Sequence, residues 1–259
     1  MTWTRRSFIC TSIIASLAVN TLPIRAQSGR GEPKPDGNSN SGSDRGRPPK
    51  RVGGGDRRGQ CNIPQTATNQ ELIALVPEQG EALSITETPT LWFYVPYAPT
   101  SPLSARFTLR DEQGRRALFA PILFPLSGTP GIIGIRLPKP LQPETSYHWY
   151  LTILCQSKAE GPGVDGWVRR VVPDSQLSQQ LQQPLSLQER LDLYQKANIW
   201  YDRLTLLAEQ HTSNAQAANK WRRLLQEIGL EALSQEPIVP CCRITSSQSQ
   251  LPISTNGAQ

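Results

Sequence analysis

The sequence predicts an α+β protein in two parts, a β-sandwich followed by a small helical domain. Between residues 61 and 172, short runs of β-branched and aromatic residues alternate with Pro and Gly turns, which is typical of a small all-β sandwich. From residue 174 the turns thin out and Leu, Gln, Glu, Ala and Arg dominate, which indicates helices. We therefore place the sandwich at 61–172 and a helical hairpin domain at 173–240.

Residues 1–26 have the layout of a signal peptide. Arg5 and Arg6 precede an apolar run over 9–19 that is too short to span a bilayer. The arginine pair followed by Phe8 resembles a twin-arginine export signal. The general secretory route stays open as the alternative. We expect cleavage near Ala26 and export to the periplasm or the medium.

Residues 27–60 are rich in Gly, Pro, Ser, Asn, Asp and Arg and hold few large apolar side chains, which predicts a disordered basic spacer. This segment carries eight basic and four acidic residues, whereas residues 61–259 carry 16 and 17. A nucleic-acid partner needs basic residues on a folded face, so we expect none. We expect at most peripheral membrane contact through the spacer.

Six segments of the sandwich region have strand character, and a turn at 111–114 joins two of them as a hairpin. They are residues 72–76, 91–97, 105–110, 116–119, 132–137 and 147–154. In the last of these, Tyr147 and Trp149 share the face that we expect in the core, and His148 and Tyr150 share the other.

Residues 141–147, which read LQPETSY, resemble the corner of fibronectin type III and immunoglobulin-like sandwiches. Residues 91–95 are apolar on both faces, so we expect one face in the core and the helical domain over the other. The competing interpretation is a ligand or interdomain surface formed by Trp92, Tyr94 and Trp167, with Trp167 in a loop at 165–167 that docks on the helical domain.

Apolar residues recur at three- and four-residue spacing through the C-terminal part, and Gly229 is placed to end the last helix. These residues are Leu187, Leu191, Tyr194, Trp200, Leu204, Leu207, Trp221, Leu224, Leu225 and Ile228. Residues 194–204 resemble the middle of a tetratricopeptide-type hairpin, so we expect a small tetratricopeptide-like domain.

Removal of the signal peptide leaves Cys61, Cys155, Cys241 and Cys242 in a compartment that permits disulfides. Four cysteines allow three pairings, of which Cys61 with Cys155 is our first hypothesis. Cys241 and Cys242, at the start of a flexible tail over 241–259, stay unassigned between a soft-metal ligand and a link to another chain.

The sequence contains no motif that indicates catalysis. Its two histidines, His148 and His211, are expected on a strand and at a helix end, and no Gly-x-Ser-x-Gly segment occurs. Without Cys-x-x-Cys spacing we expect no zinc site. We therefore expect no catalytic residue, no cofactor and no resident metal.

Several segments in order resemble one cyanobacterial family, the domain of unknown function 928 family. They are PTLWFYVPY at 89–97, LRDEQG at 109–114, YHWYLTILC at 147–155, GWVRR at 166–170 and NIWYDRLTLLAE at 198–209, together with the adjacent Cys241 and Cys242. The resemblance implies a shared fold and no site, because the family carries no established activity.

These observations favour an exported, non-catalytic interaction or structural module of the periplasm or cell envelope, with an envelope protein or glycan as its partner. The alternative is an envelope glycan-binding protein or enzyme whose site lies at the junction of the two domains.

Overall fold

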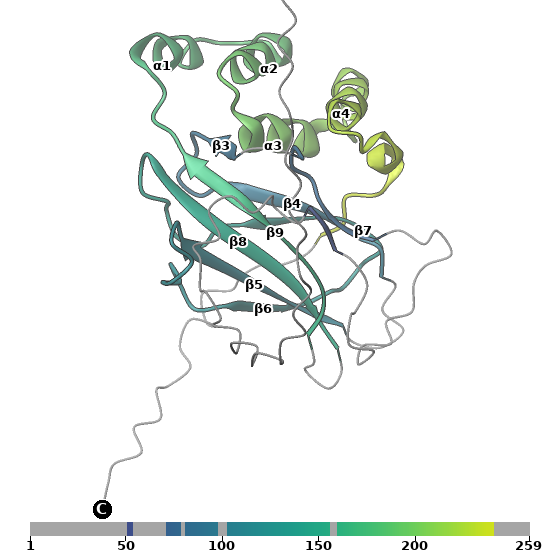
Figure 1. Ribbon diagram of the computed structural model, residues 1–259. Coiled ribbons are helices and arrows are strands. Elements are labelled where there is room, and N and C mark those ends of the chain that lie inside the picture. The colour runs from purple at the N-terminus through teal and green to yellow at the C-terminus, as the bar shows by residue number, and fades with distance from the viewer. Residues whose placement is uncertain (1–50, 54–70, 79–80, 98–102, 156–159, 241–259) are drawn as a thin grey trace, which may run out of the picture. The chain divides into compact units, whose positions relative to one another are not determined.

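The structure, a computed structural model, describes residues 51–53, 71–78, 81–97, 103–155 and 160–240. All of these residues belong to one compact unit, Gly42–Gln259. The described part is α+β, with more residues in strands than in helices (Figure 1). Its strands are β1 (Val52–Gly53), β2 (Leu72–Ala74), β3 (Ala82–Ser84), β4 (Thr90–Val95), β5 (Ser104–Asp111), β6 (Ile122–Pro125), β7 (Gly131–Arg136), β8 (Thr145–Leu154) and β9 (Glu160–Arg170). Its helices are α1 (Ser175–Leu181), α2 (Leu187–Lys196), α3 (Trp200–Gln210), α4 (Ala215–Glu227) and a 3-10 turn, η1 (Glu231–Gln235).

The strands form two sheets that share one core. The first sheet has the order β1-β2-β4-β7, and the second has the order β3-β9-β8-β5-β6. All neighbours are antiparallel except β3 and β9, which are parallel. The ring of Phe93 on β4 meets that of Trp149 on β8 edge to face at 5.3 Å, so the inner faces of the two sheets pack on each other.

The predicted strands at 72–76, 91–97, 105–110, 132–137 and 147–154 correspond to β2, β4, β5, β7 and β8. Alternation explains β8, where Tyr147, Trp149 and Leu151 are all buried on the core side. The five residues after Thr90 on β4 are all buried. This strand therefore has protein on both faces, as expected for a run without alternation.

The predicted strand at 116–119 is wrong. Only an isolated bridge joins Arg110 to Ala117, and the partner of β5 is instead β6, with Ser104–Phe107 opposite Ile122–Pro125. The chain leaves the ladder because Phe119 turns into the core and stacks on Phe107 at 6.5 Å. Pro121 follows and has no N–H to donate to a ladder.

The predicted loop at 165–167 is also wrong, because these residues lie within β9. Asp165, Gly166 and Trp167 pair in register with Tyr150, Trp149 and His148 of β8. The glycines and the proline of this segment give a poor strand signal, yet Gly166 is required here. A Cβ at Gly166 would lie 2.3 Å from Cζ2 of Trp149, so the indole occupies the space of a side chain.

Residues 51–53, predicted to lie in the spacer, are part of the fold. Val52 and Gly53 form β1 and pair with Ile73 and Leu72 of β2. The side chain of Arg51 is buried, and its Nη2 donates to the carbonyl oxygen of Ile228 at the C-terminus of α4, at 2.6 Å. This carbonyl is one of the orphan acceptors of a helix end, which explains why a basic residue of the spacer is held in the fold.

The helices agree with the predicted apolar spacing. Asp174, Ser186 and Asn214 cap α1, α2 and α4 through side-chain oxygens that accept backbone N–H groups. Gly229 follows α4 with φ of +71°, as predicted for a helix end. The helices pack on the sheets from one side. Trp200 of α3 donates from Nε1 to the carbonyl oxygen of Leu75 at 3.0 Å.

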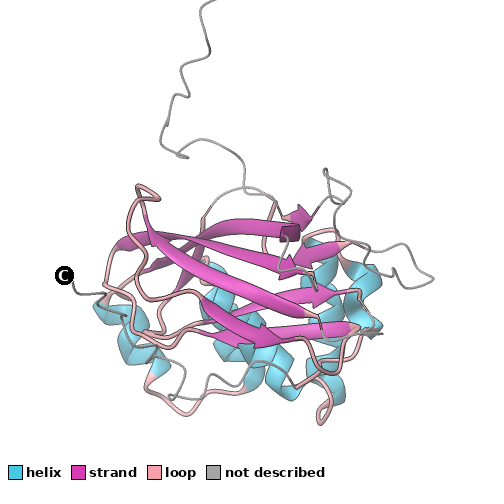
Figure 2. Cartoon of the chain, turned by 90° about the horizontal axis from the view of Figure 1, so that it is seen from below, coloured by secondary structure: helices cyan, strands magenta, loops and turns pink. Residues whose placement is uncertain are grey.

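Viewed from below, the strands lie in front of the helices, which gather on one side of them (Figure 2).

Candidate ligand-binding site

Trp92 and Tyr94, two of the predicted surface residues, are packing residues. Their exposed fractions are 8% and 1%. The indole Nε1 of Trp92 donates to Oγ1 of Thr205 on α3 at 3.0 Å, and Tyr94 shares its face of β4 by strand alternation. The helices therefore cover the outer face of β4, as the apolar run predicts.

Trp167 lies apart from these two residues. It sits on β9, on the face of the five-stranded sheet that points away from the core, whereas its neighbours Gly166 and Val168 face the core. Its ring stacks on the imidazole of His148 at 4.3 Å and 12°. The structure therefore does not bring the three predicted aromatic residues together.

A hydrogen-bonded chain of three polar side chains occupies this outer face. Nε2 of His148 lies 2.8 Å from Oδ2 of Asp165, and Nδ1 lies 2.7 Å from the hydroxyl oxygen of Tyr150. His148 is only 3% exposed, and its ring centre lies 4.3 Å from that of Trp167 and 4.2 Å from that of Tyr150. Packing and hydrogen bonds together fix the orientation of His148.

Strands β8 and β9 supply these three side chains, and the register of β8 with β5 extends the same surface. Tyr150 lies opposite Asp165 on β9 and opposite Thr108 on β5, and His148 lies opposite Arg110. Since residues i and i+2 of a strand share a face, the register gathers the outward side chains of all three strands on one surface.

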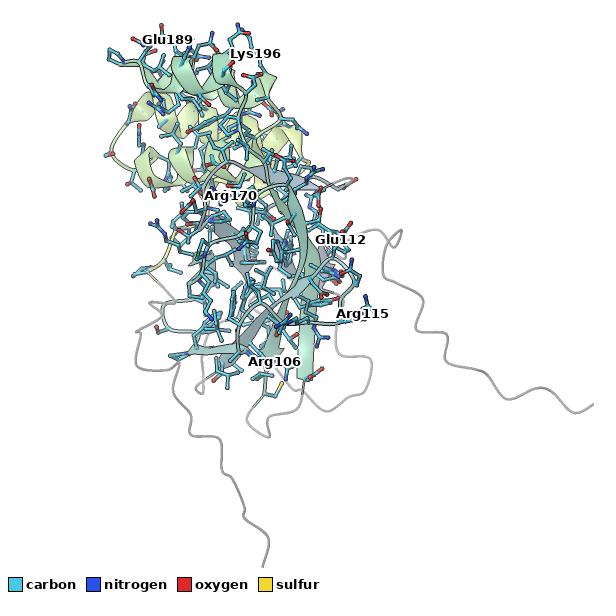
Figure 3. The ribbon with its side chains drawn as sticks, turned by 90° about the vertical axis from the view of Figure 1, so that its left-hand side faces the viewer. Arg106, Glu112, Arg115, Arg170, Glu189 and Lys196 are labelled. Atoms are coloured by element: carbon cyan, nitrogen blue, oxygen red, sulfur yellow. The ribbon has the colours of Figure 1, made fainter. Side chains whose placement is uncertain are left out.

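A groove of about 570 Å³ runs along this surface. Its lining combines two arginines, hydroxyl groups, a carboxylate and two small apolar residues. The lining residues are Arg106, Thr108, Arg110, Ala117, Pro121, Tyr150, Thr152 and Glu160. Arg106, labelled in Figure 3, marks the part of the groove that lies far from the helices. We call this feature the outer groove.

The two arginines of the outer groove differ in their environment. Arg106 forms an ion pair with Glu160, so its charge is largely balanced. Arg110 is exposed, its guanidinium carbon lies 5.9 Å from the centre of the Tyr150 ring, and Nη1 donates to the carbonyl oxygen of Gly114 at 2.9 Å. Arg110 therefore presents a positive charge beside the Tyr150 ring.

A smaller pocket of about 210 Å³ lies where the strands meet the helices. Thr86, Thr88 and Thr90 line one side, and Tyr194 and Thr205 line the other. In its wall the carboxylate of Asp202 on α3 accepts hydrogen bonds from Oγ of Ser84 at 2.7 Å, from the N–H of Ile85 at 3.1 Å and from the hydroxyl of Thr86. We call this feature the junction pocket.

Sequence reasoning missed the link between His148 and Asp165. The alternation of 147–154 places His148 and Tyr150 on one face, which was a usable signal. Asp165 is 17 positions away and was assigned to a loop, so its pairing with β8 could not be foreseen. The correct assignment of β9 as a strand would have brought all three residues together.

Of the cysteines, Cys155 lies just after β8 and is half-buried. Cys61, Cys241 and Cys242 lie outside the described residues, so the pairing of Cys61 with Cys155 stays a prediction. Over the described ranges, no group of three or more His, Cys, Asp or Glu residues is arranged to hold a metal ion. No helix in that part of the chain combines the length and apolar character needed to cross a membrane.

Comparisons with known proteins give a family match and a weak structural likeness. A solved structure of Astrotactin-2, described as a conserved vertebrate-specific and perforin-like membrane protein involved in neuronal development, aligns at 11% identity with a TM-score of 0.27. The alignment covers 63% of this chain and 29% of that one, and a likeness this weak carries no argument. No curated protein matches the chain. The family model described as Domain of Unknown Function (DUF928) matches residues 52–238, and the chain belongs to that family.

Proposed function

We propose that this protein is an exported interaction module of the cell envelope that binds a carboxylate-bearing glycan in the outer groove. The observation that carries the proposal is the groove itself, where Arg110, Tyr150 and two threonines line one surface of three paired strands. The volume of about 570 Å³ lies within the roughly 300–1,000 Å³ range of small-molecule sites, and the hydroxyl and guanidinium groups of the lining can orient a polar ligand.

The side chains of the outer groove are held in fixed positions, which supports binding. The hydroxyl of Tyr150 is held by His148, and His148 is held in turn by Asp165. These groups lose little conformational freedom when a ligand arrives, and lower ordering cost raises affinity. Strands also position such groups more rigidly than loops do.

The charges of the outer groove support an acidic ligand. Arg106 is balanced by Glu160, whereas Arg110 adds a positive charge on the exposed surface. A guanidinium binds a carboxylate through two parallel hydrogen bonds. Thr108, opposite Tyr150 on β5, and Thr152, two residues further along β8, supply hydroxyl groups, which both donate to and accept from sugar hydroxyls.

The export of the protein, its cyanobacterial origin and the finer class of its fold are part of the same proposal. The Arg5-Arg6 segment supports export. We propose a fibronectin type III-like sandwich followed by a tetratricopeptide-like hairpin. The backbone N–H of Gln142 donates to the hydroxyl oxygen of Tyr147 at 3.3 Å, which resembles the tyrosine corner of such sandwiches.

Calorimetric titration of the full chain with polygalacturonate, with neutral dextran as the comparison, tests the proposal. We expect saturable binding of the acidic polymer, weakened at least about tenfold by Arg110→Ala, since a charge-assisted pair contributes roughly 1.5–3 kcal/mol. Arg222→Ala on α4, which removes the same charge from an exposed site outside the groove, is the matched control. If the two variants weakened binding equally, the binding would depend only on the net charge of the protein, which would contradict the proposal.

The junction pocket favours a second candidate function, a glycan-binding protein or enzyme with its site between strands and helices. Its hydroxyl-rich lining, with Arg136 and Glu209 at its sides, suits a small polyol. Thr90→Val and Thr108→Val remove one hydroxyl from the junction pocket and the outer groove respectively. Selective loss of monosaccharide binding in Thr90→Val would favour this second candidate.

A further inference from the structure

The side-chain chain from Asp165 through His148 to Tyr150 has the connectivity of an activated nucleophile. A hydroxyl lies within hydrogen-bond distance of an imidazole, and a carboxylate orients the imidazole from its other nitrogen. An ionised carboxylate can only accept, so in a neutral imidazole Nε2 carries the proton and donates to Asp165. Nδ1 is then left as the acceptor, and the hydroxyl of Tyr150 donates to it.

We infer that Tyr150 is a nucleophile activated by His148 and Asp165, and that it reacts with acyl-type electrophiles that enter the outer groove. This activity goes beyond binding and does not depend on which glycan the groove recognises. The 2.7 Å and 2.8 Å hydrogen bonds place each group where a proton transfer requires it.

The reaction balances without any added redox partner. With an ester, Oη of Tyr150 forms a bond to the carbonyl carbon, and the phenolic proton moves to Nδ1 of His148. The bond from the carbonyl carbon to the alkoxy oxygen then breaks, and the leaving oxygen takes the proton from His148. The products are a tyrosyl ester and a free alcohol, and water can release the acid by the reverse proton path.

The surroundings suit this role. Asp165, whose side chain is 18% exposed, stabilises the imidazolium that forms during the transfer. The guanidinium of Arg110 near the Tyr150 ring favours developing negative charge on the phenol. Trp167 stacks on the imidazole at 12°, so the ring cannot turn away from Tyr150 without losing that contact.

An aryl sulfonyl fluoride tests the inference on the full chain, with the labelled residue located by peptide mass spectrometry. The phenol oxygen of the labelled tyrosine attacks sulfur, fluoride leaves, and the phenolic proton passes to the base. Of the chain's six tyrosines, all within the described part, the other five are buried. We expect Tyr150 to be labelled at least about tenfold faster than N-acetyltyrosinamide at the same pH, since general bases contribute 10²–10⁴-fold.

Accessibility alone would also favour Tyr150, so the deciding variant is His148→Asn. The Oδ1 atom of asparagine can accept the Tyr150 hydrogen bond in place of Nδ1 but cannot take the proton. We expect labelling at Tyr150 to fall to the rate of N-acetyltyrosinamide while the melting temperature shows that the chain still folds. Asp165→Asn should lower the labelling rate and shift its pH profile, whereas Asp165→Glu should restore part of it.

Two results would overturn the inference. One is an unchanged labelling rate in a folded His148→Asn variant, which would show that Tyr150 is merely accessible. The other is labelling of the wild-type Tyr150 no faster than that of N-acetyltyrosinamide. Neither result depends on polygalacturonate, so failure of the binding proposal and failure of this inference are separate observations.

Discussion

The indole of Trp149 lies across the backbone of Gly166, its partner in the register of β8 and β9. The same arrangement recurs in the four-stranded sheet, where Trp92 lies over Gly134 in the register of β4 and β7. In each sheet a glycine therefore makes room for a buried indole, and these glycines are packing partners rather than flexible points.

Gly166→Ala should destabilise the protein by about 2–3 kcal/mol, because overpacking of a close-packed core typically costs this much. The new Cβ would lie 2.3 Å from Cζ2 of Trp149, and the buried indole cannot move without displacing its neighbours. Urea unfolding followed by tryptophan fluorescence measures the change. Gly163→Ala on the same strand is the control, since its closest contact would be 3.3 Å; equal effects would contradict the packing argument.

Thr205→Val should cost about 1 kcal/mol of unfolding free energy, because it leaves the Nε1–H of Trp92 without its acceptor on α3. Valine keeps the shape of threonine, so the change isolates the hydrogen bond. Thermal unfolding by circular dichroism gives the measurement. Thr108→Val on the outer sheet face provides the comparison, and a larger loss there would count against this contact as a link between sheet and helix.

Deletion of residues 51–53 should lower stability in a chain that otherwise folds. Arg51 satisfies the carbonyl oxygen of Ile228, and β1 pairs with β2. Chains that begin at residue 51 and at residue 54 can be compared by urea unfolding, with an expected difference of about 2 kcal/mol for one buried charge-assisted hydrogen bond and a short strand. Equal stabilities would mean that the β1 segment contributes nothing to the fold.

The protein should lose stability between about pH 10 and pH 12. Burial raises the pKa of Tyr97 to about 12, from an ordinary value of 10.0, and burial also raises the pKa of Tyr201. A group with a raised folded-state pKa keeps its proton more tightly when folded, so its contribution is complete below about pH 10 and disappears as the pH rises. Urea unfolding across this range should reveal the loss, which Tyr97→Phe should reduce; an unchanged loss in that variant would contradict the assignment to Tyr97.

A disulfide between Cys61 and Cys155 should appear as one linked peptide in a non-reducing digest of the protein kept under oxidising conditions. By the chain-entropy argument a loop of this length contributes roughly 4–5 kcal/mol. We expect Cys155→Ser to lower the melting temperature, with Cys242→Ser as the comparison. A peptide that links Cys155 to Cys241 or Cys242 would replace this pairing with another.

The sequence predicts the strands best where apolar residues alternate. Tyr147, Trp149 and Leu151 identify β8 because each points into the core and each is flanked by an outward residue. The helices could be predicted equally well, since Trp221, Leu224 and Leu225 repeat at helical spacing and are all buried in α4. Local chemistry and tertiary packing agree in both cases, which is why local reasoning suffices.

The candidate site could not be predicted as a whole because a long-range register creates it. Gly166 lowers the strand signal of β9, yet it is present because Trp149 needs its space. This requirement is invisible until the two strands are paired. Asp165 therefore looked like a loop residue, and His148 looked like a strand histidine without a partner.

Two main-chain contacts from the C-terminal half cover the edge strands of the two sheets. Ile199, just before α3, bridges Leu83 of β3, and Ile238, after η1, bridges Ile132 of β7. β3 and β7 are terminal strands of their sheets, and unpaired terminal strands are templates for strand addition by other molecules. Before the helical segment has folded onto the sheets, the edges of both β3 and β7 would be exposed. The helical segment therefore also shields these edges from amyloid-like pairing with other molecules.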